Sequence, residues 1–176
     1  FITKKFKGDF FTAAAINEIA ELSKKFGVTL IGNGMGKNVQ TLKFAAAVCR
    51  KITGFKVVDA DAIAAVRLQD VKNTIFTPHH AEYDLLLRNS GMTFLRKRSI
   101  KNGGNNSVTE LRKIIGTNII LIKGKVDKIV AKNKTAYNKT GNAGMTVGGT
   151  GDVLAGLAAG LLAQEKDLFK AACAAA

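Results

Sequence analysis

Cysteine, proline and tryptophan are scarce in this chain, which has two cysteines, one proline and no tryptophan in 176 residues. So few cysteines exclude a disulfide-stabilised scaffold, and Cys49 and Cys173 do not have metal-ligand spacing. We expect both to be buried, reduced thiols of a cytoplasmic protein. The apolar runs are too short or too interrupted to cross a membrane, and no segment resembles a signal peptide. Secreted disulfide-rich and membrane-spanning classes are therefore excluded.

Acidic residues are also scarce, with 13 Asp and Glu against 27 Lys and Arg, and the net charge is +14. Such a balance can indicate a nucleic-acid-binding module, which stays open as an alternative. The basic residues, however, are spread over several predicted elements, and the one dense cluster, Arg96–Arg98 with Lys101, has no aromatic residues interleaved for base stacking. This distribution favours a solvated basic surface that also attracts anionic small molecules.

Hydrophobic residues, in contrast, are plentiful at 47%. The length and this composition suit one globular domain over residues 1–176, with a core of its own. The chain begins at Phe1 rather than Met and stops within an apolar run that lacks a polar end. We therefore expect an incomplete domain, a piece of a longer one.

Short apolar runs alternate with segments of helical periodicity. Strands are predicted over residues 28–31, 55–61, 73–76 and 118–122, with a hairpin over 129–137. A helix is predicted over 9–26, and further helices are predicted to begin just after residues 36, 61 and 78 and at residue 152. Another begins at Ser107, where Ser107 and Glu110 form a capping box. One helix should bury Leu42, Ala45, Ala46 and Cys49. The alternation predicts an α/β domain with a mostly parallel central sheet, right-handed crossovers and helices on both faces.

Chemically distinctive segments follow the predicted strands or precede a helix. They are residues 32–36, Asp59, 77–82, 123–127 and 148–152. Because ligands bind at the carboxyl edge of open α/β sheets, we expect these segments to converge there as one active site.

Asp59 and Asp61 end a predicted strand at positions i and i+2, which would place both carboxylates on one face. They can hold Mg²⁺ or polar groups of a ligand. Asp61 also precedes a helical pattern, where an acid suits the first turn. We favour Asp61 as a helix cap and Asp59 as the functional candidate.

Pro78 favours a helix that begins just after it, which places His79 and Glu82 about one turn apart at its start. The positive end of a helix disfavours a charged imidazole, so a neutral His79 is expected. A solvent-exposed histidine and a Glu82 that only complements the helix dipole are equally compatible with the pattern. Lys123, at a strand end beside a glycine, can reach a nucleotide phosphate or can mark where the strand meets water.

The most distinctive stretch is the glycine-rich loop 142–152, which runs directly into an apolar helix. Glycines permit a positive φ and close approach of a ligand, and the first turn of a helix offers unpaired N–H groups. This combination predicts an anion site, most often for phosphate. A carboxylate among those donors, Asp152, is better suited to act as a base than to bind the anion.

The stretch 148–152 with its following helix resembles the anion-hole and base motif of the ribokinase-like superfamily. Residues 31–36, 58–62, 77–82, 121–124 and 140–145, in this order and spacing, resemble the ADP-dependent NAD(P)H-hydrate dehydratases, which remove water from hydrated nicotinamide cofactors. The resemblance covers nearly the whole chain from about Asp9. It implies a ribokinase-like fold and dehydration of NADHX or NADPHX driven by ADP or ATP.

The resemblance also implies residue roles. Asp152 would be the catalytic base, and the hydrated dinucleotide would contact Gly34, Gly36, His79 and Asp152. The adenine nucleotide would contact Lys123, Gly124, Lys125, Val126, Asp127, Gly149, Thr150 and Gly151. Supporting roles are expected for Asp59, Glu82 and Asn142, while Mg²⁺ would be held mainly through the nucleotide phosphates. Two positions depart from the family pattern: Asn33 stands where proline is usual and Asp127 where threonine is common.

The implied reaction phosphorylates the hydroxyl of the hydrate and then eliminates phosphate. A ribokinase-like kinase acting on a heterocyclic alcohol is the main alternative, because the glycine loop alone indicates only phosphoryl transfer. Beyond its small-molecule substrates, the resemblance implies a homo-oligomer with no nucleic-acid or membrane partner. It also suggests an NAD(P)HX epimerase domain, fused or separate.

Overall fold

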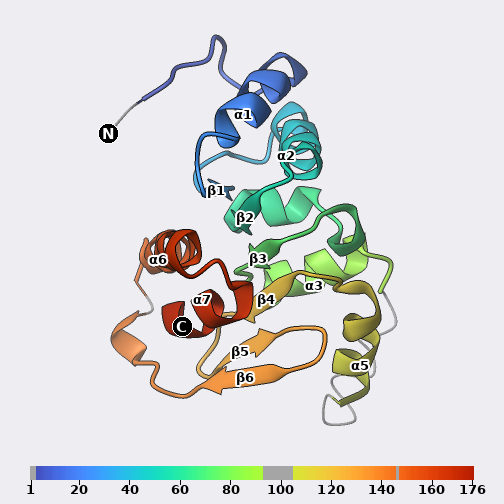
Figure 1. The fold of residues 1–176 in the computed structure, drawn as a ribbon, viewed down its shortest axis with the longest axis vertical. Helices are drawn as coiled ribbons and strands as arrows, with labels where there is room; N and C mark the ends of the chain where they lie inside the picture. The colour runs from blue at the N-terminus through green and yellow to red at the C-terminus, as the bar shows by residue number, and fades with distance from the viewer. Residues whose placement is uncertain (1–2, 93–104, 146) are drawn as a thin grey trace.

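The computed structural model describes residues 3–92, 105–145 and 147–176. Its six strands form one sheet in the order β1-β2-β3-β4-β5-β6, in which β1 to β4 are parallel and β5 and β6 are antiparallel (Figure 1). The strands are β1 (Val28–Ile31), β2 (Phe55–Val58), β3 (Thr74–Phe76), β4 (Ile119–Ile122), β5 (Asp127–Val130) and β6 (Thr135–Asn138). The predicted mostly parallel α/β sheet and the hairpin are thus confirmed.

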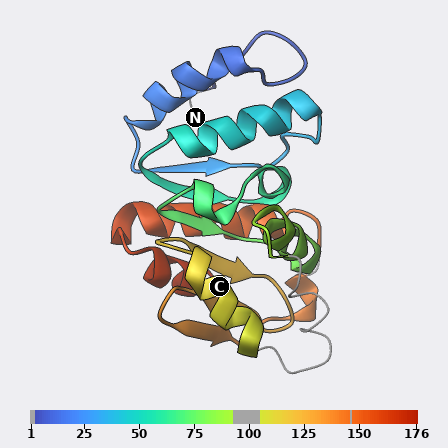
Figure 2. The ribbon, with the colours of Figure 1, turned by 90° about the vertical axis from the view of Figure 1, so that its right-hand side faces the viewer.

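Helices cover both faces of the sheet, as predicted (Figures 1 and 2). The α-helices are α1 (Ile16–Ser23), α2 (Val39–Lys51), α3 (His80–Asn89), α5 (Asn105–Ile114), α6 (Thr150–Glu165) and α7 (Leu168–Ala175). Short 3₁₀ helices are η1 (Ala13–Ala15), η2 (Ala60–Ala65), η3 (Leu68–Asp70) and η4 (Ala143–Met145). One apolar cluster joins the sheet to α2, α3 and α5, and a second joins its other face to α6 and α7.

Neighbouring strand residues supply the two clusters in turn, because successive side chains of a strand point to opposite faces. In β2, Val57 packs toward α6 and α7, whereas Val58 packs toward α2. Ile75 and Phe76 divide in the same way in β3. Strands that are apolar on both faces are typical of parallel sheets covered by helices, and here they hold the carboxyl ends of β1 to β4 side by side.

Several element boundaries differ from the predictions. The helix expected over residues 9–26 is divided into η1 and α1, and α5 begins two residues before Ser107. The strand expected over 55–61 ends at Val58, since the backbone turns at Ala60 (φ 48°) into η2. Asp59 and Asp61 therefore do not share one face of a strand, and that prediction was wrong. The basic cluster at 96–101 lies outside the described residues.

The apolar face of α2 also differs in part from the prediction. Ala45 and Cys49 are buried as expected, but Leu42 and Ala46 are only half-buried. Phe44 and Val48 fill the core beside them. The buried face of α2 is thus centred on Phe44, Ala45 and Val48 and is rotated away from Leu42 and Ala46.

The two cysteines differ in exposure. Cys49 is buried as predicted, and burial raises the pKa of its thiol to about 12, so it stays protonated and unreactive at neutral pH. Cys173 is only half-buried, and burial raises the pKa of its thiol as well. Within the described ranges, no helix combines the length and the apolar character needed to cross a membrane.

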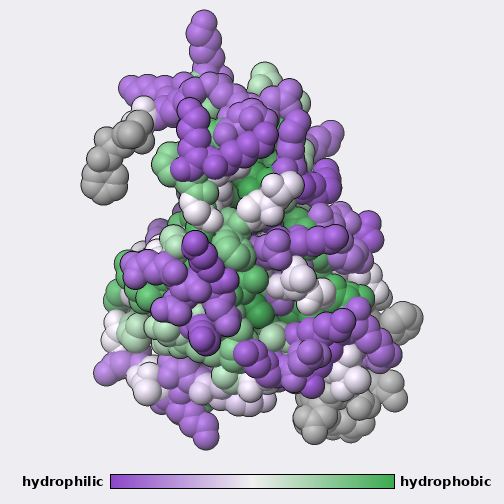
Figure 3. Space-filling model, in the orientation of Figure 1, coloured by the Kyte–Doolittle hydropathy of each residue, from purple (hydrophilic) through white to green (hydrophobic). Residues whose placement is uncertain are grey.

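Hydrophilic side chains cover the end of the molecule that carries α1 and α2, and apolar side chains reach the surface around α6 (Figure 3). Two large apolar side chains of α6 are exposed, Val153 at 71% and Leu157 at 47%.

Candidate functional site

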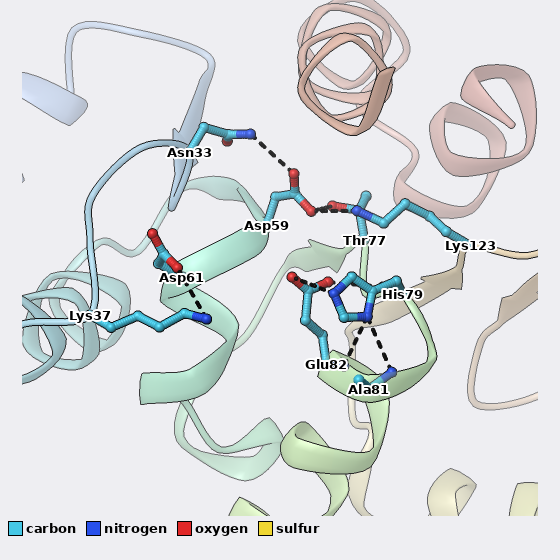
Figure 4. Close-up of polar contacts among 9 residues, drawn as sticks. All are labelled: Asn33, Lys37, Asp59, Asp61, Thr77, His79, Ala81, Glu82 and Lys123. Atoms are coloured by element: carbon cyan, nitrogen blue, oxygen red, sulfur yellow. Dashed lines mark hydrogen bonds and ion pairs between the residues drawn. The ribbon is translucent and has the colours of Figure 1, made fainter. Parts of the chain in front are cut away.

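A buried carboxylate, Asp59, lies at the centre of the carboxyl edge of the sheet, with only 1% of the residue exposed. Its Oδ1 accepts hydrogen bonds from Thr77 Oγ1 at 2.8 Å and Lys123 Nζ at 2.9 Å (Figure 4). Its Oδ2 accepts a hydrogen bond from Asn33 Nδ2 at 3.1 Å. Asn33, Asp59, Thr77 and Lys123 each follow a different parallel strand, so the predicted convergence of strand ends is confirmed for these four positions.

Lys123 is placed by the backbone beyond β4. Its N–H donates to the carbonyl of Pro78 at 2.8 Å, and it pairs in parallel with His79. Its side chain is 21% exposed and neutralises the Asp59 carboxylate, which would be costly to bury alone. Asp59 therefore positions Lys123, and its oxygens are engaged by three donors of the protein.

The glycine loop after β1 is held by two features. A Cβ at Gly32 (φ 130°) would lie 1.8 Å from the carbonyl oxygen of Asp59, so only glycine fits there. Asp61 Oδ2 accepts a hydrogen bond from the Gly36 N–H at 2.9 Å, and Lys37 Nζ lies 3.9 Å from Asp61 Oδ1 (Figure 4). Asp61 thus fixes the loop that carries Gly34 and Gly36; it is not the N-cap of η2, a position that Asp59 occupies.

His79 and Glu82 form a capping box at the start of α3. His79 Nδ1 accepts hydrogen bonds from the N–H groups of Ala81 and Glu82 at 3.1 and 3.2 Å, and Glu82 Oε2 accepts one from the His79 N–H at 2.9 Å (Figure 4). Nδ1 is therefore unprotonated. The Nε2 edge lies 3.3 Å from Glu82 Oε1, and the imidazole is 57% exposed. His79 is therefore solvent-exposed, and Glu82 serves the helix start, as the two simpler interpretations of the sequence predicted.

The start of α6 has no such cap. Its N-cap is Gly149, in the left-handed region (φ 91°), and it has no side chain to accept hydrogen bonds from the first turn. A Cβ at Gly151 would lie 3.4 Å from Lys123 Nζ, so the lysine ammonium lies against this turn. An open helix N-terminus beside an ammonium group is suited to bind a phosphate.

Asp152, the third residue of α6, is exposed beside that turn. Its Oδ1 accepts a hydrogen bond from Asn33 Nδ2 at 2.5 Å. One amide group thus connects Asp152 to Asp59. Asn33 was missed as a site residue; the only sequence signal was a polar side chain within a glycine loop after a strand.

The remaining predicted residues lie in two local turns. Asp127 Oδ1 accepts a hydrogen bond from the Gly124 N–H at 2.9 Å, which closes the 124–127 turn around Lys125 and Val126. A Cβ at Gly124 would lie 3.1 Å from His80 Nε2, so this turn lies against the start of α3. Asn142 Oδ1 accepts a hydrogen bond from the Gly144 N–H at 2.8 Å, within its own loop.

The donor set favours an anion over a metal ion. Among the described residues, no three His, Cys, Asp or Glu side chains are grouped as metal ligands. The buried carboxylate of Asp59 already accepts three hydrogen bonds. The strand ends and α6 instead supply an ammonium group, N–H groups and one exposed carboxylate.

Sheet order, helix layers and this edge define a ribokinase-like α/β protein. The structure is similar to that of a ribokinase-like superfamily protein from Enterococcus faecalis, with a TM-score of 0.68, 25% identity and coverage of 89% of this chain and 55% of that chain. More specifically, the chain belongs to the NAD(P)H-hydrate dehydratase family, whose model matches residues 3–176.

Two relatives show how much of a longer protein the chain covers. It is 35% identical over 178 residues to the bifunctional NAD(P)H-hydrate repair enzyme Nnr of Methanocaldococcus jannaschii, covering 99% of this chain and 32% of the relative. It is 39% identical over 121 residues to the ADP-dependent (S)-NAD(P)H-hydrate dehydratase of Cenarchaeum symbiosum, covering 68% of this chain and 40% of that relative. The chain thus spans about a third of the length of the first relative.

Proposed function

We propose that the chain forms part of a dehydratase that converts hydrated NADH or NADPH (NADHX or NADPHX) to the reduced cofactor at the expense of ADP or ATP. The observation that carries the proposal is the exposed Asp152 carboxylate, which lies at an open helix start beside Lys123. A base next to a phosphate site is what phosphorylation of a hydroxyl requires. Family membership and the names of the relatives support this substrate over other alcohols.

Hydroxide is a poor leaving group, so the reaction first converts it to a better one. Asp152 accepts the proton of the ring hydroxyl, whose oxygen attacks the terminal phosphoryl group of the nucleotide. A new P–O bond forms, and the bond from phosphorus to the shortened nucleotide breaks. The C–O bond of this phosphate ester then breaks, and phosphate leaves with the electron pair, assisted by the adjacent ring nitrogen. Loss of a ring proton restores the dihydronicotinamide.

The nucleotide side of the site comprises Lys123 and the start of α6. Gly149 and Gly151 present backbone N–H groups to the phosphates, and Thr150, whose own N–H donates to the Val147 carbonyl at 3.4 Å, lies between them. The Lys123 ammonium neutralises charge that develops during transfer. The turn of residues 124–127, with Lys125, Val126 and Asp127, lies beside the nucleotide. Mg²⁺ bound to the nucleotide phosphates would add to this charge stabilisation.

The dinucleotide side comprises the glycine loop and the start of α3. Gly34 and Gly36 have positive φ values of 67° and 76° and lie in the loop that Asp61 fixes. The Nε2 edge of His79 is the part of that ring not used for capping, and it contacts the substrate. Asp59 and Glu82 support these groups through their hydrogen bonds to Asn33 and to the His79 N–H, whereas Asn142 supports its own loop through the Gly144 N–H.

The proposal also concerns the longer protein to which this chain belongs. We infer that residues 1–176 form a single ribokinase-like unit, which covers 32% of the M. jannaschii relative and 40% of the C. symbiosum relative. The description of the M. jannaschii relative as bifunctional supports an epimerase activity fused to, or partnered with, this one. A homo-oligomeric state and a cytoplasmic location stay predictions from the sequence.

The direct test is to incubate the protein with hydrated NADH, Mg²⁺ and either ADP or ATP. We expect the absorbance of the reduced cofactor to return and one free phosphate to appear per cofactor repaired. A heterocyclic-alcohol kinase would instead accumulate a stable phosphorylated product, and a nucleic-acid-binding module would show only salt-sensitive binding to RNA or DNA. Either result would contradict the proposal.

A further inference from the structure

We propose that Asn33 is the positioning residue of the base: its side-chain amide holds the exposed Asp152 carboxylate against the buried Asp59. The inference rests on the proposed role of Asp152. Asn33 belongs to the loop proposed to bind the dinucleotide, and Asp152 belongs to the helix proposed to bind the nucleotide. A change in the position of either segment would therefore move the other.

The amide nitrogen of Asn33 serves two carboxylates at once. It donates to Asp59 Oδ2 at 3.1 Å and to Asp152 Oδ1 at 2.5 Å. Its Oδ1 is buried without a hydrogen-bond partner among the described residues. The opposite amide orientation would direct that oxygen toward two carboxylate oxygens. The two charge-assisted hydrogen bonds therefore fix the orientation and offset the unsatisfied oxygen.

The contacts form a continuous series from β4 to α6. Lys123 and Thr77 fix Asp59, Asp59 fixes the Asn33 amide, and the amide holds Asp152. An exposed carboxylate otherwise samples several rotamers, and a base must lie in one of them to accept its proton. The buried members of the series thus supply the rigidity that Asp152, on the surface, lacks.

The amide also separates two like charges. Lys123 Nζ donates to Asp59 and lies against the start of α6, and the Asn33 amide donates to both Asp59 and Asp152. The nearby charged groups at the other strand ends are paired elsewhere, Lys37 with Asp61 and His79 with Glu82 (Figure 4). Removing the donor would leave Asp152 without its hydrogen bond to the β1 loop, while Lys123 stays with Asp59.

The test replaces Asn33 in the full chain. Asn33→Leu keeps the approximate shape and removes both donors, Asn33→Asp replaces them with a third carboxylate, and Asn33→Ser retains one donor. We expect Asn33→Leu to lower kcat by about tenfold to a hundredfold and leave the KM for the nucleotide nearly unchanged. Asn33→Asp should lose more, and Asn33→Ser should fall between the parent and Asn33→Leu.

Asn38 provides the matched control, since it caps α2 a few residues further along the same segment. Asn38→Ala should lower the melting temperature without changing kcat. Equal kcat losses in Asn33→Leu and Asn38→Ala would show a merely structural role and overturn the inference. Parent-like kcat in Asn33→Leu would overturn it as well.

A double-mutant cycle on melting temperature tests the contact without any substrate. Asn33→Leu, Asp152→Ala and the double variant are compared with the parent. We expect the double variant to lose less than the sum of the two single losses, because each single change already breaks the shared contact. Additive losses would overturn the inference whether or not the protein is a dehydratase. Coupling without turnover in the parent would instead contradict the proposed function alone.

Discussion

Helices α3 and α6 both begin at the carboxyl edge of the sheet, and each carries a carboxylate as its third residue, Glu82 and Asp152. The start of α3 is closed: the His79 imidazole accepts from its first turn, and Glu82 accepts from the His79 N–H. The start of α6 is open, because its N-cap is Gly149. Its acid accepts a hydrogen bond from Asn33 of the β1 loop instead.

A helix N-terminus can bind an external anion where its own side chains leave the N–H donors free, and the two starts differ in this respect. The Ala81 and Glu82 N–H groups of α3 are satisfied by His79 Nδ1, so this start holds the His79 side chain in place. In α6 the Thr150 N–H donates to the Val147 carbonyl, and no side chain at the N-cap accepts from the rest of the first turn, which lies beside Lys123. The acid at the closed start is structural and the acid at the open start is available for chemistry.

Replacing the two acids with their amides tests this comparison most strongly. Asp152→Asn removes the base, so we expect turnover to fall by about a hundredfold to ten-thousandfold while nucleotide binding persists. Glu82→Gln keeps an oxygen that can accept from the His79 N–H, so turnover should stay within a few-fold of the parent. Steady-state kinetics with hydrated NADH, and calorimetry with ADP, provide both measurements.

The two variants can also disprove the comparison. Parent-like turnover in Asp152→Asn would exclude this residue as the base. A larger loss of turnover in Glu82→Gln than in Asp152→Asn would reverse the roles assigned to the two helix starts.

Much of the fold could be predicted from the sequence, because the apolar runs of β1, β3 and β4 are short, separated by helical patterns and bounded by turn residues. The limits of β2 could not be predicted. Nothing in the local pattern indicates that Ala60 adopts a positive φ. Asp59 and Asp61 were therefore compatible both with an extended strand and with the start of a helix. Gly32 packs directly against the carbonyl group of Asp59, where the chain turns after β2. This contact joins segments that are distant in the sequence, so the local pattern could not reveal it.

The site was predictable where its chemistry depends on position along the chain. Pro78 locates the start of α3, and the glycines before Asp152 locate that of α6. The role of Asn33 was not predictable, because it depends on two carboxylates that lie 26 and 119 residues away. A polar side chain in a turn has many local uses, and only the folded sheet edge selects this one.

Closing the open helix start is the second test. Gly149→Asp adds a carboxylate at the N-cap of α6, which competes with the phosphates and is strained at a φ of 91°. We expect the affinity for ADP to fall by about tenfold to a hundredfold, equivalent to about 1.4 to 2.8 kcal/mol. Titration calorimetry measures this loss.

Gly160 supplies the control in the same helix, since a Cβ there meets nothing within 4 Å. Gly160→Ala should raise the free energy of unfolding by up to about 1 kcal/mol and leave ADP affinity unchanged. If Gly149→Asp bound ADP as tightly as Gly160→Ala does, the phosphates would have to lie elsewhere.

The smallest expected effect comes from opening the closed start. His79→Ala removes the acceptor of the Ala81 and Glu82 N–H groups, which should cost about 1 kcal/mol of stability and lower the melting temperature by about 2–4 °C. His79→Asn keeps an acceptor at the N-cap and should recover the melting temperature, while the KM for the hydrated cofactor stays raised in both variants because the Nε2 edge is gone. A KM that recovers together with the melting temperature would show that His79 acts only through the helix cap, and the substrate contact would then belong to the glycine loop alone.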